Sequence, residues 1–164
     1  MNTAHGYAAK TTVSVDKSRA EIERVMTRFG ATSFVCGWHG PCAVLMFEAK
    51  GRRLRFDLPI PDVNDKQFGS RSLTQRQKLQ EQEARRRWRS LLLVIKAKLE
   101  SIASGIETFD EAFLSHIVVP GGETIAEWAI PQIVRAYADG LQLPPLLGGG
   151  PGTRDSSRGE EIGS

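Results

Sequence analysis

Residues 32–61 carry three short strand patterns separated only by tight turns, and this run constrains the fold more than any other part of the chain. In the third pattern, RRLRFDLPIP, Leu54, Phe56 and Leu58 alternate with charged residues, as in a strand with one buried face. The middle pattern, CAVLMFEA, is apolar in both phases, which is typical of a central strand. Strands joined by such short turns are antiparallel neighbours, so the sequence predicts a three-stranded antiparallel sheet.

The ends of these patterns set the predicted strand bounds. The first pattern, TSFVCGW, covers residues 32–38, and HGP at residues 39–41 supplies the turn into the second at 42–49. Lys50 and Gly51 make the turn into the third at 52–61. Pro59 and Pro61 predict that this third strand lies at an edge of the sheet, because proline cannot donate to a strand ladder.

Helical patterns flank the strands. The capping box SRAE predicts a first helix from Ser18 to Gly30, whose apolar stripe consists of Ile22, Val25, Met26 and Phe29. A second box, SLTQ, predicts a long helix from Ser72 to Ser104. Its first half is almost wholly polar, and it either projects into solvent, is ordered by a partner or frays.

Two more capping boxes, TFDE at 108–111 and TIAE at 124–127, predict shorter helices, the last ending at Gly140. The predicted fold class is therefore α+β: a helix, a three-stranded antiparallel sheet and a long helix in αβββα order, plus a small helical C-terminal module. We expect a flexible N-terminus at 1–11, a single domain at 12–147 and a disordered tail at 148–164. Within that domain, the core covers 12–104 and the module 105–147.

Membrane insertion and secretion are not indicated. Uninterrupted apolar runs, such as residues 91–95, are far shorter than the roughly 20 residues that a membrane span needs. The N-terminus has neither a basic start nor an apolar signal core, so we expect a cytoplasmic protein. Cys36 and Cys42 are too few to staple a domain of this size, and we expect free thiols in a reducing compartment.

Charge is distributed unevenly along the chain. Residues 50–98 contain 14 Lys and Arg against 5 Asp and Glu, whereas residues 99–164 contain 3 against 10. The net charge of +3 therefore conceals a strongly basic middle and an acidic C-terminal third. These two parts either pair with each other or face different partners.

The basic residues of the long helix sort onto distinct faces at about 100° per residue. Trp88 falls on the apolar stripe with Leu92 and Ile95, which predicts a core anchor rather than a platform for stacking bases. Cations that could neutralise phosphates lie along its flanks, on the third strand and at the turn before that strand. These candidate nucleic-acid-binding residues are Arg85, Arg86, Arg87, Arg89, Lys96, Arg53, Arg55, Arg52 and Lys50. Of these, Arg85, Arg89 and Lys96 share one ridge.

A solvated surface is the alternative interpretation of the same charges, with Arg85 to Arg89 pairing to Glu81, Glu83 or the acidic C-terminal module. The αβββα order is also that of double-stranded RNA-binding domains, although the likeness is topological only. Neither interpretation is excluded by the sequence.

Catalytic and metal-binding signatures are weak. Cys36, His39 and Cys42 have a Cys-x2-His-x2-Cys spacing, but a structural zinc needs a fourth ligand and none is evident. Asp110 and Glu111 occupy a helix's first turn, where negative charge needs no catalytic explanation. No nucleophile, base and oxyanion site converge, so we expect a non-enzymatic protein without a cofactor.

Several segments together resemble a group of small proteins encoded in bacteriophages and prophages. They are EIERVMTRFGA, GRRLRFDLPIPD, RRRWRSLLLVIKAKLESIASGIETFDEAFLSHIVVPGGETIAEW and PQIVRAY, and the likeness covers about residues 12–147. No activity or functional residue accompanies the resemblance. It implies a setting in the host cytoplasm, in DNA metabolism or in dealing with host factors.

Two functions follow as hypotheses. The first is a non-enzymatic accessory protein that binds DNA or RNA through the basic helix flank and strand edge. The alternative is a protein-interaction module, either a phage inhibitor of a host factor or an assembly subunit. Leu73, Leu79 and Leu93 lie away from the core stripe, and both phases of the central strand are apolar, so a homodimer would cover one of these surfaces.

Overall fold

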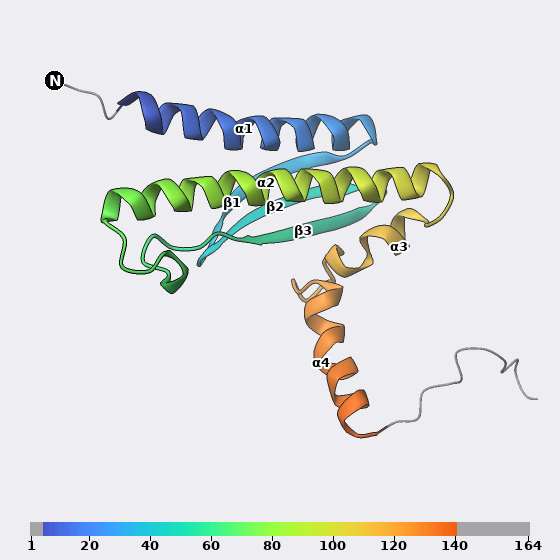
Figure 1. Ribbon diagram of the computed structural model, residues 1–164. Helices are drawn as coiled ribbons and strands as arrows, with labels where there is room; N and C mark the ends of the chain where they lie inside the picture. The colour runs from blue at the N-terminus through green and yellow to red at the C-terminus, as the bar shows by residue number, and fades with distance from the viewer. Residues whose placement is uncertain (1–4, 141–164) are drawn as a thin grey trace, which may run out of the picture. The chain divides into compact units, whose positions relative to one another are not determined.

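A three-stranded antiparallel sheet and two long helices build the protein (Figure 1). The computed structural model describes residues 5–140, and side chains from residue 15 onward. The strands β1 (Thr32–His39), β2 (Cys42–Ala49) and β3 (Arg52–Pro59) follow each other in the order β1-β2-β3. The helices α1 (His5–Arg28) and α2 (Leu73–Ala103) lie side by side and run in the same direction. This confirms the predicted α+β class and element order.

Tight turns fix the register of the sheet. Lys50 and Gly51 both have positive φ, of 51° and 73°, as a two-residue hairpin turn requires. They align β2 and β3 over their full length, from Cys42 opposite Pro59 to Ala49 opposite Arg52. The pairing of β1 with β2 is interrupted by a bulge between Thr32 and Val35.

One face of the sheet packs against both helices. Alternate residues of β2 are buried, and their neighbours are half-buried on the other face. Ile22 and Met26 of α1 are fully buried above the sheet, as is Ile95 of α2. Trp88 is 5% exposed within the same core, which confirms that it is a core anchor and leaves it unable to stack on bases.

The start of the first helix differs from the prediction. Helix α1 begins at His5 rather than Ser18, so Ser18 lies inside the helix and the predicted capping box there is wrong. The Glu21 side chain contacts Lys96 and Arg24 instead of turning back to Ser18. No proline interrupts the preceding residues, and the helix continues upstream through them.

The other capping boxes are confirmed. The Ser72 hydroxyl accepts from the Gln75 amide at the start of α2, and Thr108 caps α3 (Phe109–Phe113) in the same way. A short 3-10 turn (Leu114–His116) follows α3. The loop before α2 contains another 3-10 turn (Lys66–Phe68), whose Phe68 is buried.

The outer edge of β3 is partly covered, although β3 is the last strand in the order. Leu54 of β3 bridges to Ile117, and the Val118 amide donates to the Arg53 carbonyl. A tight turn then leads to α4 (Ile125–Ala138), which contains Pro131.

The chain divides into two compact units, residues 1–130 and 131–164. Helix α4 therefore crosses the division between them. None of its residues is buried. The predictions for residues 1–4 and 141–164, including the tail at 148–164, lie outside the described residues.

Candidate nucleic-acid interface

A basic groove runs between α1 and α2, and we call it the α1–α2 groove. Its volume is about 680 Å³. It is lined by Lys17, Ser18, Glu21, Gln82, Arg85, Arg86, Arg89, Leu92, Leu93 and Lys96. Five of these side chains are cationic and only one is a carboxylate, so the lining of the groove has a net positive charge.

Helical periodicity explains why these cations meet. On α2, Arg85, Arg89 and Lys96 are spaced by four and seven residues and share one ridge beside the buried stripe. On α1, Lys17 lies one turn before Glu21 on the polar side of the helix. The helices α1 and α2 lie side by side and run in the same direction (Figure 1), and residues of both rows line the groove.

Two of the groove's cations already have partners inside the protein. Lys96 forms an ion pair with Glu21 of α1, and the hydrogen bond from Lys96 lowers the pKa of the Glu21 carboxyl. Arg86 donates to both carboxylate oxygens of Glu83, with 2.8 Å between its Nη2 and Oε2. A phosphate that binds here must displace these carboxylates or bind alongside them.

Two other cations are free to bind an external anion. Among the residues that the structure describes, no carboxylate lies within ion-pair distance of Lys17 or Arg89. Both side chains are exposed. They are therefore the groove residues best placed to meet phosphate without first breaking an internal contact.

The predicted residues on β3 and its turn lie elsewhere. Lys50, Arg52 and Arg53 line a separate pocket of about 570 Å³ at the β2–β3 turn, which shares no residue with the α1–α2 groove. Arg53 pairs with Glu48 at 2.9 Å, and Arg52 with Asp110 at 3.0 Å. The predicted cations of the helix and those of the turn therefore lie in two separate basic regions.

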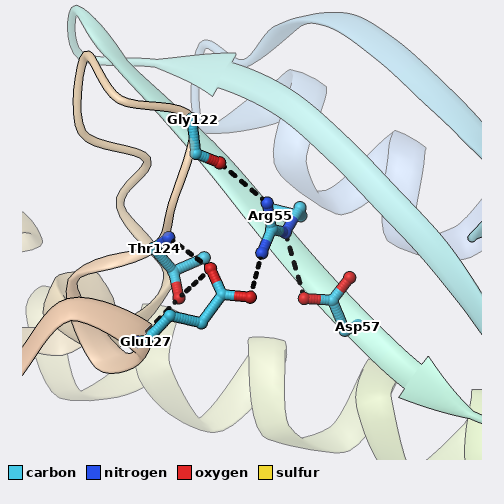
Figure 2. A network of polar contacts seen from close by, with 5 residues as sticks. All are labelled: Arg55, Asp57, Gly122, Thr124 and Glu127. Atoms are coloured by element: carbon cyan, nitrogen blue, oxygen red, sulfur yellow. Dashed lines mark hydrogen bonds and ion pairs between the residues drawn. The ribbon is translucent and has the colours of Figure 1, made fainter. Parts of the chain in front are cut away.

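Arg55 is the most heavily engaged of the predicted residues (Figure 2). Its guanidinium donates to Asp57 at 3.0 Å, to the Gly122 carbonyl at 2.9 Å and to Glu127. Glu127 also accepts from the backbone amide of Thr124, and this bond, ahead of the charge of Arg55, lowers the pKa of the Glu127 carboxyl. Arg55 thus joins β3 to Gly122 and to Glu127 of α4.

Arg87 completes the predicted set on the opposite flank of α2. It donates to the Pro59 carbonyl and lies near Glu83, so it attaches the helix to the end of β3. Of the nine predicted residues, the groove therefore gathers Arg85, Arg86, Arg89 and Lys96 and leaves out the other five.

Sequence reasoning missed Lys17. The signal was a polar face of α1 on which Lys17, Glu21, Arg24 and Arg28 recur at spacings of four, three and four residues. Arg24 and Lys17 line a further depression of about 330 Å³ next to the groove. The spacing alone could not show that this face borders α2.

The Cys-x2-His-x2-Cys spacing does not bring its three donors together. Cys36 is opposite the buried Leu45 and so is on the helix-covered face, whereas His39 and Cys42 pair with each other on the other face. Within residues 5–140, no cluster of three or more His, Cys, Asp or Glu side chains could hold a metal ion.

Comparisons with protein-family models, curated proteins and solved structures give no match for this chain. The resemblance to phage-encoded proteins stays a prediction. No helix in the described part of the chain has the length and apolar character to cross a membrane.

Proposed function

We propose that this protein is a non-enzymatic nucleic-acid-binding protein that holds a phosphate backbone in the α1–α2 groove. The observation that carries the proposal is the convergence of five cations from two helices, with Lys17 and Arg89 free of internal carboxylates. Lysine and arginine that neutralise phosphates release condensed counterions, which supplies affinity without sequence recognition.

The dimensions of the ridge suit a short stretch of backbone. Arg85 and Lys96 are eleven residues apart on α2, which is about 16 Å at a rise of about 1.5 Å per residue. That length matches about five nucleotides at about 3.4 Å each along one strand of a duplex. Because Trp88 is buried, the groove offers charge rather than an aromatic platform, which favours backbone recognition over base recognition.

Binding by fluorescence anisotropy tests the proposal. Labelled single- and double-stranded DNA and RNA are titrated with the protein at about 50 mM and about 200 mM salt, where backbone contacts predict much tighter binding at the lower concentration. A double variant, Lys17→Gln with Arg89→Gln, should bind weakly. The matched control, Lys66→Gln with Arg135→Gln, removes the same charge outside the groove and should bind like the wild type. No binding of any of the four ligands at micromolar protein and low salt contradicts the proposal.

A protein-interaction module is the second candidate, and the surface of α4 favours it. Ile130, Ile133, Val134 and Tyr137 are each between 51% and 63% exposed. An apolar row on one helix is typical of a surface that another protein covers. Pull-down from bacterial lysate with the wild type and an Ile133→Ser, Tyr137→Ser variant tests this, because a partner held by α4 is lost in the variant. Recovery of the same proteins by both contradicts it.

A further inference from the structure

The outer edge of β1 is open. In the described part of the chain β1 pairs with β2 alone, which leaves a row of backbone amides and carbonyls on its other side. Natural edge strands are usually protected by charged side chains, proline or bulges. The sequence of β1, TSFVCGWH, contains no Lys, Arg, Asp, Glu or Pro, and its bulge lies only at the start, between Thr32 and Val35. Residues 35–39 are therefore a regular, uncharged edge.

The edge strand β1 also carries a large, exposed apolar side chain. Trp38 is 68% exposed, an unusual state for an indole. The register places it opposite Ala43 and places Cys36 opposite Leu45, and both of these β2 residues are buried. Trp38 and Cys36 therefore point to the same, helix-covered face of the sheet.

The same strand also borders a depression on that face, between β1 and α1. Its volume is about 330 Å³. It is lined by Asp16, Arg19, Ala20, Glu23, Phe34, Cys36 and Leu45. Its β-strand side is thus apolar, while α1 supplies carboxylates at its border that can accept a hydrogen bond from an indole N–H.

We propose that two copies of this protein dimerise by antiparallel pairing of β1 with β1 about a two-fold axis at Cys36. In this register residues 35–37 pair within the regular edge, and Phe34, in the bulge beside it, comes next to Trp38 of the partner subunit. Each indole then enters the depression of the other copy. The partner is a second copy of this protein because a single two-fold axis accounts for three features at once. It pairs the open edge of β1, covers the exposed indole of Trp38 and fills the depression. The uncharged edge also places no like charges opposite each other.

The contact is small, so the dimer should be weak. Two indoles bury about 150–250 Å² each, and the strand pairing adds a short ladder. The total lies at the low end of specific interfaces, which are about 1,200 Å² or more, so we expect dissociation at micromolar concentrations.

Sedimentation equilibrium between roughly 5 and 200 µM, a range around the expected dissociation constant, tests the dimer in the absence of nucleic acid. The wild type should show a monomer–dimer equilibrium, and Trp38→Ala should remain monomeric. Trp128→Ala is the matched control, since it removes another indole, 57% exposed on α4, and should dimerise like the wild type. Circular dichroism checks that each variant is folded. A wild type that is monomeric throughout, or a folded Trp38→Ala that dimerises equally well, overturns the proposal.

Cysteine cross-linking tests the register independently. Directly opposed residues of antiparallel strands have Cα atoms about 4.5–5.5 Å apart, within the range that a disulfide spans. Oxidation with copper–phenanthroline should therefore join Cys36 to Cys36 of the partner subunit. Cys42→Ser should retain the cross-link and Cys36→Ser should lose it. A cross-link that needs Cys42 instead, or a dimer that forms none, places the contact elsewhere and overturns the proposed pairing.

Discussion

Removing the two free cations of the α1–α2 groove should change how binding depends on salt. Each neutralised phosphate contributes about −0.7 to the log-log slope of affinity against salt for single strands, and about −0.9 for duplex DNA. Five cations line the groove, which sets an upper limit of about −3.5 for a single strand. Between 50 and 200 mM salt, a slope of that size lowers affinity by about 130-fold.

The Lys17→Gln, Arg89→Gln variant removes two of these five charges. Its slope should fall to about −2.1, so the same fourfold rise in salt lowers its affinity by only about 18-fold. Anisotropy titrations at five or more salt concentrations measure both slopes. The Lys66→Gln, Arg135→Gln control should keep the wild-type slope. If the groove variant also keeps it, or if both variants lose the same amount, phosphate does not bind where we place it.

Three further outcomes follow from particular contacts. Glu21→Gln should raise nucleic-acid affinity in the same titration, because it removes the carboxylate that competes for Lys96. The expected rise is roughly two- to fivefold, which corresponds to the free energy of one exposed ion pair. Weaker binding would contradict this. Ile95→Ala should lower the free energy of unfolding in urea by about 2–5 kcal/mol, because Ile95 is fully buried, and a change below about 1 kcal/mol would contradict the described core. His116 stacks on Phe56 with 4.0 Å between ring centroids, and burial, ahead of the charge of Lys98, lowers its pKa from 6.5. Folding therefore favours the neutral imidazole of His116. The stability that this residue contributes is present above pH 6.5 and is lost as pH falls through the lowered pKa. Between pH 7.5 and 5.5 the urea midpoint should fall further for the wild type than for His116→Gln, and equal falls would contradict this assignment.

The sheet was predictable because its signals are local. Alternation of Leu54 and Phe56 with charged neighbours fixes which side of β3 is buried, and Lys50-Gly51 fixes the turn that sets the register. The capping boxes at Ser72 and Thr108 likewise act within four residues.

The box at Ser18 shows the limit of such signals. Its Ser and Glu are also tolerated inside a helix, so the motif marks a start only where the preceding residues leave the helical conformation. Here they do not, and Glu21 turns to Lys96 across the helix pair instead. The residues that decide this helix start lie upstream of the motif, and Glu21 is engaged by a residue 75 positions away.

The candidate site was predictable in part for the same reason. The ridge of Arg85, Arg89 and Lys96 follows from the spacing on one helix, and the structure retains it. Two facts needed the tertiary structure: that Lys17 faces this ridge, and that Arg55 is held by Glu127. Both depend on which elements become neighbours, and a charge pattern on a single element carries no such information.

NMR titration of the ¹⁵N-labelled protein with a short single-stranded oligonucleotide locates the interface directly. Backbone amides of residues 17–28 in α1 and 85–96 in α2, together with the Nε–H groups of Arg85 and Arg89, should shift on binding and return as salt is raised. The amides of β3 from Arg52 to Arg55 should stay in place. Shifts confined to β3 and its turn, or no salt-sensitive shifts at all, would contradict the α1–α2 groove as the phosphate-binding surface.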